Sequence, residues 1–576
     1  MRATWIARQP ARADELVNLG ARVELLVASG LERDLATLLA WRGITTASEA
    51  AAFLAPGVED LHDPLLLLGM QEALDLLVAA HERGHRVAVV GDYDVDGLTA
   101  TALLLGVFRA LGIETHGILP NRHASGYGLQ PQHVRLADEL GCRLLVTVDC
   151  GIQAHEAIAE ATSRGLPVIV TDHHLPGNRP GDGPLGAAAV INPRQAGCRY
   201  PFRDLAGVGL ALKVATALLT RFGREIPWAA LFRISCLGTI ADAAPLVGEN
   251  RVLASRGLAA LARTPSVGLR ALLDEAEVGT PVSAHDVGFR IGPRLNSAGR
   301  LGAADPALEL LLTRDPKRAR ELAAQLGRWN SERRTLEARV LADCEARYAG
   351  RPLSAVVVGW SPAWHRGVVG IAAGRLARRF HRPALLFAVE DGLAIGSGRS
   401  VPGIDLHGFL RPWEPRLERF GGHSQAVGLT AREPALAGLA QEWEAAAATW
   451  PPETLATQVE YDQELAISDV TSSLLDRLAR LEPFGVGNPE PIFHIGPCRL
   501  SGPPRAFGAG HLGFCARATD GSTVEVVAWQ GAQLAATSGG MFDGEFEMLA
   551  AVELDRFRNR PRLRLVDSRP VAAQTN

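Results

Sequence analysis

Acidic and imidazole side chains follow three short apolar runs in the first half of the chain. The run Val87–Val90 leads into GDYDVDG, Leu144–Val148 leads into DCG, and Val168–Thr171 leads into DHH. A lone Asp after a strand usually forms a turn or caps a helix, but three such strand ends together call for another explanation. Carboxylate and imidazole ligands without thiolates suit Mn²⁺ or Mg²⁺. The side chains concerned are Asp92, Asp94, Asp96, Asp149, Asp172, His173 and His174.

A fourth candidate place, in addition to the three strand ends, is Asp242 in GTIADAAPL, which ends an apolar helical run. A pair of divalent ions about 4 Å apart can clamp a phosphate, make hydroxide from water and stabilise the leaving oxygen. A phosphate could not approach so many bare carboxylates, so the cations are needed electrostatically as well as chemically. These residues therefore predict a two-metal site for phosphate-ester hydrolysis.

The elements that must position these side chains are strands alternating with helical stretches, which predicts a parallel, doubly wound α/β sheet. In such sheets ligands bind beyond the carboxyl ends of the strands, where these acids and histidines fall. A second α/β pattern begins near Leu353, with SAVVVGW and PALLFAV flanking the helical VVGIAAGRLARRF. After about Pro451, alternating strands with Gly-rich turns predict a small β-barrel.

A chain of 576 residues is too long for one compact core, so three or four domains are expected. Short helices with breaks at Gly43, Pro56 and Pro64 are predicted at the start, and a connecting helix rich in Arg, Glu, Leu and Ala lies between the two α/β patterns. The expected parts are a helical segment 1–80, a catalytic domain 81–304, a connecting helix 305–348, a second α/β domain 349–450 and a β-barrel 451–576.

Composition excludes some classes of protein but does not choose a substrate. Seven cysteines without any CxxC pair fit a reducing cytoplasm and argue against zinc ribbons and disulfide frameworks. We find no secretory signal and no apolar stretch that could span a bilayer, so we expect a cytoplasmic protein without membrane contact. The net charge is −4, although Arg is dense in 314–334 and 556–564. Either tract could equally be a solvated surface.

The motifs GDYDVDG, VTVDCG, TDHH and ADAAPL match, in order, the four motifs of the DHH phosphoesterase superfamily. The chain resembles the RecJ branch of that superfamily, the single-strand-specific exonucleases, over nearly its whole length. Further RecJ-like stretches are PNRHASGYGL, IGPRLNSAGRLG, WHRGVVGIAAGRL, GSGRS, GGHSQAVG and LEPFGVGNPEP. GGHSQAVG resembles the substrate-binding signature of the companion DHHA1 domain, and the C-terminal part resembles the OB-fold of RecJ proteins.

The resemblance implies a role for each motif residue at the metal site. Asp94 would bind one ion and Asp96 the other, and Asp149 would bridge both. His173 and Asp242 would complete the shell of the second ion.

Two further motif residues have other expected roles. His174 would lie beside the phosphate, stabilising charge or donating a proton, whereas Asp92 would either bind an ion or orient a ligand. Related phosphatases carry a histidine four residues before the first ligand Asp. Here that position is Val90, so the first ion is expected to be more open and more weakly bound.

Substrate-binding residues are also implied by the resemblance, and each has a purely structural alternative. Arginine donates two parallel hydrogen bonds to a phosphate, but it can equally cap backbone carbonyls. Paired glycines allow close approach of an anion to the backbone, but they also make plain turns. The expected set is Arg122, Arg294, Asn296, Ser397, Arg399, Gly421, Gly422 and His423. Base-stacking candidates, each of which could be a core residue instead, are Tyr127, Phe514, Trp529 and Phe557.

The function implied by the resemblance is 5′ to 3′ hydrolysis of single-stranded DNA to 5′-mononucleotides, in recombination and repair. Expected associates are a single-strand-binding protein and a helicase, and the protein is expected to be a monomer. One alternative is a DHH phosphodiesterase of short oligonucleotides or cyclic dinucleotides, which usually lacks a terminal barrel. The other is a non-catalytic DNA-binding scaffold, against which the retained ligand set speaks.

Overall fold

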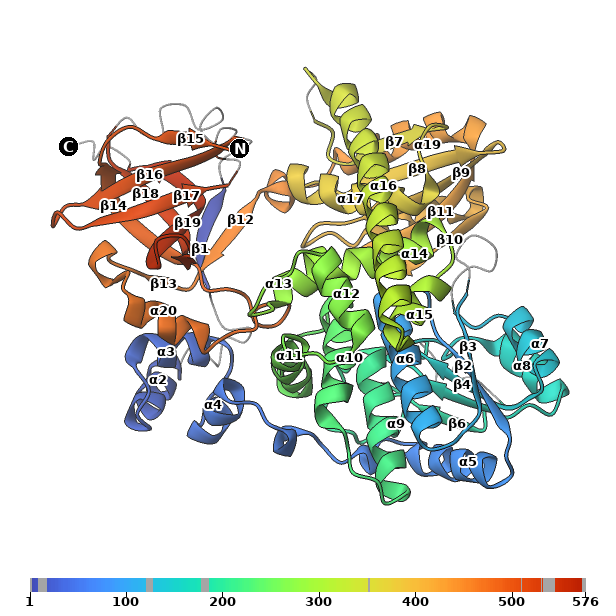
Figure 1. The fold of residues 1–576 in the computed structure, drawn as a ribbon. Helices are drawn as coiled ribbons and strands as arrows, with labels where there is room; N and C mark the ends of the chain where they lie inside the picture. The colour runs from blue at the N-terminus through green and yellow to red at the C-terminus, as the bar shows by residue number, and fades with distance from the viewer. Residues whose placement is uncertain are drawn as a thin grey trace. The chain divides into compact units, whose positions relative to one another are not determined.

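The computed structural model describes residues 3–8, 18–120, 128–177, 186–350, 353–508, 510–529, 531 and 544–571. Contacts between Cα atoms divide the chain into two compact units (Figure 1). Unit 1 contains Asp63–Asp242 and Gly257–Thr457, whereas unit 2 contains Arg2–His62, Ala243–Arg256 and Gln458–Asn576.

The first α/β domain of unit 1 is built on a five-stranded parallel sheet in the order β3-β2-β4-β5-β6. The sequence prediction of strands leading into the acidic motifs is confirmed, because β2, β4 and β5 end directly before them. The strands are β2 (Arg86–Val90), β3 (Thr115–Ile118), β4 (Cys142–Val148), β5 (Val168–Thr171) and β6 (Ala189–Ile191).

Helices cover both faces of this sheet, as expected for a doubly wound fold (Figure 1). Ala88, Val90 and Leu145 face a core shared with α7 and α8, whereas α6 and α9 contact β4 from the other side. Both faces are therefore dry, which explains the nearly continuous apolar sequence of the strands. The helices are α5 (Met70–Glu82), α6 (Val95–Ala110), α7 (Pro131–Glu139), α8 (His155–Ser163), α9 (Gly207–Arg221) and α10 (Trp228–Ala241).

Strand order reverses at β2. The chain first adds β3 on one side of β2, and then adds β4, β5 and β6 on the other side. The boundary between β2 and β4 is therefore the topological switch point, where the loops that leave the sheet diverge and open a crevice. The acidic loops after β2 and β4 both begin at this point.

Helices connect this domain to the second α/β domain of unit 1. The expected single helix 305–348 consists instead of two helices, because Asp315 accepts a hydrogen bond from Lys317 N and Pro316 occupies the first helical position. The helices are α12 (Val267–Glu275), α13 (Ala284–Asp286), the π-helical turn η3 (Val287–Ile291), α14 (Gly292–Leu301), α15 (Asp305–Leu312) and α16 (Pro316–Tyr348).

The second α/β domain has a mixed sheet in the order β10-β11-β9-β8-β7, in which only β7 and β8 run parallel. Separate apolar clusters cover its two faces. Its elements are β7 (Val357–Ser361), α17 (Arg366–Phe380), β8 (Ala384–Glu390), β9 (Leu393–Arg399), α18 (Leu406–Leu410), η4 (Arg411–Arg416), β10 (Arg419–His423), β11 (Ala426–Arg432), α19 (Glu433–Ala447) and η5 (Pro452–Leu455).

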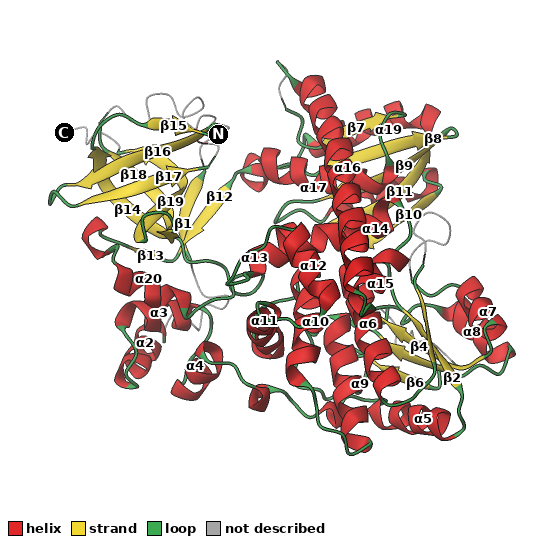
Figure 2. Cartoon of the chain, viewed as in Figure 1, coloured by secondary structure: helices red, strands yellow, loops and turns green. Residues whose placement is uncertain are grey.

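Unit 2 contains the expected β-barrel (Figure 2). Strands in the order β14-β18-β19-β17-β16 close through pairing of β14 with β16. The C-terminal elements of unit 2 are the strands β12 (Gln458–Tyr461), β13 (Gln463–Glu464), β14 (Phe493–Leu500), β15 (Arg505–Phe507), β16 (His511–Ala518), β17 (Thr523–Ala528), β18 (Phe546–Asp555) and β19 (Arg560–Pro570), with the helices η6 (Ile467–Asp469) and α20 (Ser472–Ala479).

The expected N-terminal segment 1–80 divides between the two units. Its first strand pairs in parallel with β12, and its first three helices share a continuous apolar core with the barrel. The remainder, including α5, belongs to unit 1. The unit 2 elements are β1 (Thr4–Ala7), α2 (Leu19–Ala28), α3 (Arg33–Trp41), α4 (Ala47–Leu54) and η1 (Val58–Asp60), while η2 (Pro64–Leu66) begins unit 1 and α11 (Gly248–Leu261) runs across the boundary.

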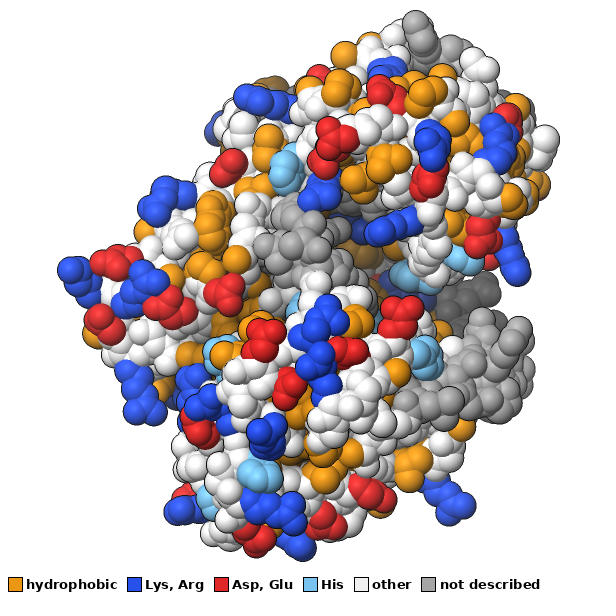
Figure 3. Space-filling view, turned by 90° about the vertical axis from the view of Figure 1, so that its right-hand side faces the viewer, with side chains coloured by type: hydrophobic (Ala, Val, Ile, Leu, Met, Phe, Trp, Pro, Cys, Tyr) orange, Lys and Arg blue, Asp and Glu red, His pale blue; other side chains and the backbone are white. Residues whose placement is uncertain are grey.

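Two general expectations can be compared with the structure. All seven cysteines are free, and six of them are buried. Within the described ranges, no single helix is both long enough and apolar enough to cross a bilayer, although one bent helix pair, Val58–Leu66 with Met70–Glu82, passes that test when counted together. Acidic and basic side chains are interspersed over the face that Figure 3 shows.

Candidate active site

The loop after β2 delivers two acids through the start of α6. Asp94 caps this helix, with Oδ1 accepting hydrogen bonds from Asp96 N at 3.0 Å and Gly97 N at 3.1 Å. Asp96 lies in the first turn and is buried. Because the cap fixes the first turn, the Asp94 and Asp96 carboxylates are held by one rigid element.

The Asp96 carboxylate also meets the start of α9. Its two oxygens accept hydrogen bonds from Gly207 N at 2.6 Å and Val208 N at 2.8 Å. A helix N-terminus has unused N–H donors and favours an anion. Burial and the neighbouring charges of Asp242 and Asp94 nevertheless outweigh these bonds and raise the pKa of Asp96 well above its usual value. A buried carboxylate of this kind requires a cation to remain ionised.

Asp149 is the central acid of the site. It has φ of +60°, a left-handed conformation that Asp tolerates better than most residues, and it is 2% exposed. Its Oδ1 lies 3.1 Å from His173 Nε2, yet neither atom has a hydrogen-bond partner among the described residues. Burial, followed by the charges of Asp96, Asp94, Asp92 and Asp242, raises the pKa of Asp149 well above its usual value.

His174 is oriented by Asp172 and Asn192, neither of which was expected in this role from the sequence. Asp172 Oδ1 lies 2.7 Å from His174 Nδ1, and Asn192, at the end of β6, donates to the His174 backbone carbonyl at 2.9 Å. Both side chains are almost completely buried. Burial disfavours the charged imidazole, but the hydrogen bond and charge of Asp172 outweigh it and raise the pKa of His174 to about 9. The Asp of TDHH was a visible signal in the sequence, whereas the role of Asn192 depends on the fold.

Potential ligand atoms fall into overlapping groups within 4.8 Å of one another. One group comprises Asp92, Asp94 and Asp149, and a second comprises Asp96, His173 and Asp242. Asp149 also groups with the two histidines, so it links the two sets. The fold therefore brings together the six expected metal ligands and His174, from the loops after β2, β4 and β5 and from the end of α10.

The donor set and its electrostatics fit divalent cations. Burial and the charge of Asp94 raise the pKa of Asp92 to about 8 and that of Asp242 to about 7. Burial lowers the pKa of His173 to about 4, which leaves the imidazole neutral, as a metal ligand must be. Asp242 is exposed as a residue, but its carboxylate belongs to the group with Asp96 and His173. Asp149 Oδ1 and His173 Nε2 are buried, lie 3.1 Å apart and have no hydrogen-bond partner among the described residues. A cation in contact with both atoms would satisfy them.

Val90 contributes nothing to the site, because its side chain is fully buried in the core under α7 and α8. Asp92 lies two residues further along the chain. It is 1% exposed, and Gly128 N lies 3.4 Å from its Oδ1. Its membership of the first ligand group favours direct metal binding over a role in orienting another ligand.

The expected substrate-binding residues fall in three places. Arg294 and Asn296 lie on α14 and line one cavity, and Arg294 donates to the carbonyls of Arg290 at 2.7 Å and Glu275 at 3.2 Å. Ser397 and Arg399 lie on β9, with Arg399 Nη1 donating to Ser397 Oγ at 2.8 Å. Arg122 lies outside the described residues, as does Tyr127.

The paired glycines form part of an exposed β-hairpin. β10 and β11 pair with Gly421 opposite Gly428 and with Gly422 opposite Val427. Gly422 has φ of +137°, and a Cβ there would lie 2.2 Å from Ala426 O, so only glycine fits. A Cβ at Gly421 would meet nothing within 4 Å, which leaves its backbone open to an approaching group. His423 Nδ1 accepts a hydrogen bond from Gln425 N at 3.3 Å inside the turn.

The stacking candidates in unit 2 differ in exposure. Phe514 is 6% exposed and packs in the barrel core, whereas Trp529 is 45% exposed and Phe557 is 96% exposed. Trp529 forms an edge-to-face cluster with Phe507 and His511. Phe514 is thus a core residue, and the other two rings are accessible.

Models of known protein families match three regions of the chain. Residues 86–239 match the DHH family N-terminal domain, residues 353–449 match the DHHA1 domain, and residues 461–567 match the RecJ OB domain. These matches fall inside the expected domains 81–304, 349–450 and 451–576. The chain is 38% identical over 484 residues to the single-stranded-DNA-specific exonuclease RecJ of Dickeya dadantii, covering 79% of this chain and 82% of that relative.

The chain belongs to the RecJ family. It is also 37% identical over 463 residues to the RecJ of Bacillus subtilis, covering 79% of this chain but only 58% of that relative's length. Among solved structures, the RecJ of Thermus thermophilus in complex with Mn²⁺ has a TM-score of 0.81 and 33% identity, covering 99% of this chain and 80% of that one. The RecJ-like motifs in the sequence are thus accompanied by a RecJ-like fold.

Proposed function

We propose that this protein is a metal-dependent exonuclease that degrades single-stranded DNA from the 5′ end to 5′-mononucleotides. The observation that carries the proposal is the pair of linked ligand groups at the switch point of the DHH domain. Membership of the RecJ family supports the choice of substrate, since the similar proteins from Dickeya and Bacillus are named single-stranded-DNA-specific exonucleases.

The ligand groups indicate which residues would hold Mn²⁺ or Mg²⁺. Asp92 and Asp94 would serve one ion, Asp96, His173 and Asp242 the other, and Asp149 both. Two ions bound there would supply Lewis-acid chemistry, activating a water molecule and neutralising charge on the phosphate and the leaving oxygen.

His174 is the residue that would supply the proton needed by the leaving oxygen. Water adds to phosphorus, and the bond between phosphorus and the 3′ oxygen of the released nucleotide breaks, so this oxygen must gain a proton. Asp172 binds Nδ1 of His174 and favours the charged ring, which leaves Nε2 as the nitrogen directed to a substrate. His174 can therefore stabilise the phosphate charge and donate the proton.

The substrate-binding assignments extend over both α/β domains of unit 1. Ser397 and Arg399 on β9 are suited to a terminal 5′-phosphate, and Arg294 and Asn296 to the DNA backbone. Arg294 already caps two carbonyls, but these neutral partners do not cancel its positive charge. We expect selectivity for one strand to arise from a channel too narrow for a duplex.

In the cell, such an enzyme would trim strands during recombination and repair. A helicase would supply unwound ends, and a single-strand-binding protein would keep them open. We expect the protein to act in the cytoplasm as a monomer. These points follow from family membership and are testable separately from the chemistry.

The decisive experiment uses matched oligonucleotides labelled at the 5′ or 3′ end, presented as single strands or as blunt duplexes. With Mn²⁺ or Mg²⁺, a 5′-labelled single strand should release labelled mononucleotide first, a 3′-labelled strand should shorten progressively, and chelator should stop both. The duplex should survive. Binding without cleavage under every divalent cation would favour a DNA-binding scaffold, and cleavage confined to dinucleotides would favour a short-substrate phosphodiesterase.

A further inference from the structure

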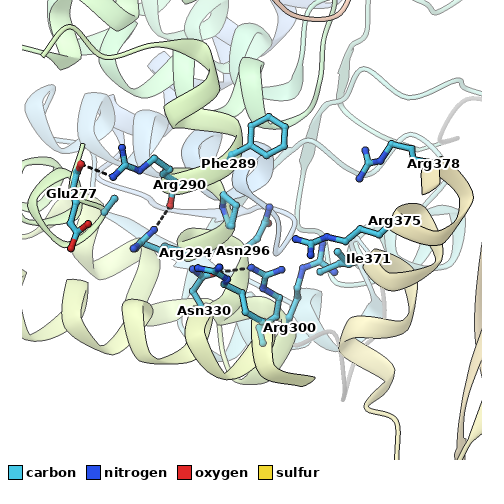
Figure 4. A pocket seen from close by; sticks show the side chains of 14 residues that line it. Glu277, Phe289, Arg290, Arg294, Asn296, Arg300, Asn330, Ile371, Arg375 and Arg378 are labelled. Carbon is cyan, nitrogen blue, oxygen red and sulfur yellow. Dashed lines mark hydrogen bonds between the residues drawn. The ribbon is translucent and has the colours of Figure 1, made fainter. Parts of the chain in front are cut away.

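A cavity of about 530 Å³ in unit 1 is lined mainly by arginine. Half of its fourteen lining residues are arginines, and Glu277 is the only carboxylate among them. They come from the end of α12, from η3, α14 and α16, and from α17 in the second α/β domain (Figure 4). Only Arg294 and Asn296 of this set were expected from the sequence to bind DNA.

Carboxylates close to the cavity balance only part of its charge. Arg290 lies 3.3 Å from Asp286, and the single buried carboxylate of Glu337 serves Arg333 and Arg375, each at 2.6 Å. In the described parts of the chain, neither Arg334 nor Arg378 forms an ion pair. The cavity therefore has an excess of guanidinium groups, which are suited to binding phosphate.

An accessible aromatic ring stands at the edge of the same cavity. Phe289 is 71% exposed and stacks on His285, with ring centroids 4.6 Å apart and planes inclined by 24°. It lies in η3, and π-helical turns often occur at functional sites. An exposed ring beside arginines offers a platform for a nucleobase next to a site for its phosphate.

The helix α14 connects this cavity with the metal-site loop. A Cβ at Gly299 would lie 2.9 Å from Tyr93 O, between Asp92 and Asp94, so α14 packs directly against that loop. Arg334 also lines a second cavity of about 640 Å³ along α16, together with Arg339. Basic surface thus extends from the helix beside the active site along α16.

We propose that the arginine cavity binds an internal nucleotide of the single strand, distinct from the one being released. Its phosphate lies among Arg334, Arg375 and Arg378, and its base stacks on Phe289. This inference rests on the proposed function, and it adds a second binding site for the strand. A free nucleotide offers the same phosphate and base chemistry, so the test separates the two sources.

The first measurement compares rates on 5′-phosphorylated single strands of two to twenty nucleotides for the wild-type protein, Arg378→Ala and Phe289→Ala. Both variants should raise KM by roughly 5- to 20-fold for strands long enough to reach the cavity, with kcat unchanged. The shortest strands should be unaffected, and Arg378→Lys should recover part of the loss. The matched control is Arg109→Ala, an exposed arginine at the end of α6 remote from the acidic loop. Equal effects at every length, or none, would overturn the proposal.

The second measurement titrates fluorescent twenty-nucleotide strands and, separately, dAMP in the presence of chelator, where catalysis is absent. The proposal expects Arg378→Ala to weaken strand binding, with dAMP remaining a poor ligand. Tight dAMP binding that depends on Arg378, with unchanged strand binding, would reassign the cavity to free nucleotides and refute the proposal. Strand binding that depends on Arg378 without any cleavage would retain this inference while refuting the proposed function.

Discussion

The acidic cluster at the strand ends and the arginine cavity beside α14 both concentrate like charge, but they are built differently. Most of the acids are buried, all but Asp242 follow neighbouring parallel strands, and their carboxylates crowd within a few ångströms of one another. The arginines come from separate helices and line an open space, with some of their charge offset by Asp286 and Glu337. The acidic cluster therefore needs cations in order to ionise, whereas the cavity is permanently charged and ready for an anion.

A third charged region sharpens this contrast. The arginine tract 556–564 in unit 2 forms surface ion pairs, including Arg560 with Glu525 at 2.5 Å and Arg562 with Glu553 at 2.6 Å. In sequence, this tract and 314–334 look alike. The difference lies in the carboxylates that the fold supplies, so arginine density alone does not identify a binding site.

The largest expected effect concerns the central acid. Asp149→Asn should lower exonuclease activity by at least about 1,000-fold, because it removes a ligand shared by both groups. Asn keeps the shape of Asp and tolerates its left-handed backbone. The variant should also raise the melting temperature of the metal-free protein, since the native pKa of Asp149 lies above the unfolded value of about 3.9.

The stabilisation of Asp149→Asn should depend on pH in a defined direction. A raised native pKa makes ionisation costly in the folded state, so the wild-type protein loses stability as pH rises above the unfolded value. The gain should be larger at pH 8 than at pH 5, as measured by thermal unfolding with chelator. A lower melting temperature for the variant at pH 8 would show that ionised Asp149 does not destabilise the folded protein.

Metal affinity should weaken as pH falls. Asp92 and Asp242, with pKa values of about 8 and about 7, must both lose protons before they can bind an ion. The apparent Kd for Mn²⁺ should increase by about tenfold for each pH unit and each proton displaced below these values. Calorimetry between pH 8 and pH 6 measures both affinity and proton release, and a pH-independent Kd would contradict the crowding of the acids.

A smaller effect separates the two arginine-rich regions. Arg378→Ala should reduce the slope of log affinity against log salt for single-stranded DNA by about 0.7, the value of one phosphate contact. Arg560→Ala, with its ion pair on the barrel hairpin, should leave the slope unchanged. Fluorescence anisotropy from 50 to 300 mM salt distinguishes the two, and equal slope changes would remove the distinction.

The smallest expected effect concerns an uncharged contact in unit 2. Trp529→Ala should weaken strand binding by about 5-fold, at the low end for base stacking, without changing the salt slope. Phe514→Leu is the control, because Phe514 is only 6% exposed and lies in the barrel core. An effect of Phe514→Leu on affinity with normal folding would place the binding face elsewhere.

The metal site could be largely predicted from the sequence, because each ligand follows a strand or a helix whose periodicity is local. The strands before Asp92, Asp149 and Asp172 end where expected, and parallel pairing then forces their loops together. The four ordered motifs supplied Asp242 as well. The break between α15 and α16 also had a local signal in Asp315 and Pro316, which mark a helix start.

The arginine cavity could not be predicted, since its residues meet only after several helices pack. Arg334, Arg375 and Arg378 belong to no acidic motif, and although Arg375 lies in the RecJ-like stretch WHRGVVGIAAGRL, nothing in the sequence indicates that these three arginines meet. The grouping of the first helices with the barrel core also depends on long-range packing. The role of Asn192 likewise requires β6 to lie beside β5.

The most direct test of the account is anomalous diffraction from crystals grown with Mn²⁺. The account predicts two peaks about 4 Å apart at the ends of β2, β4 and β5, with the Asp149 carboxylate touching both. Asp149→Asn crystals should lose at least one of them. Peaks remote from these strand ends, or full occupancy of both positions in the variant, would contradict the claim that these acids converge to hold two catalytic metal ions.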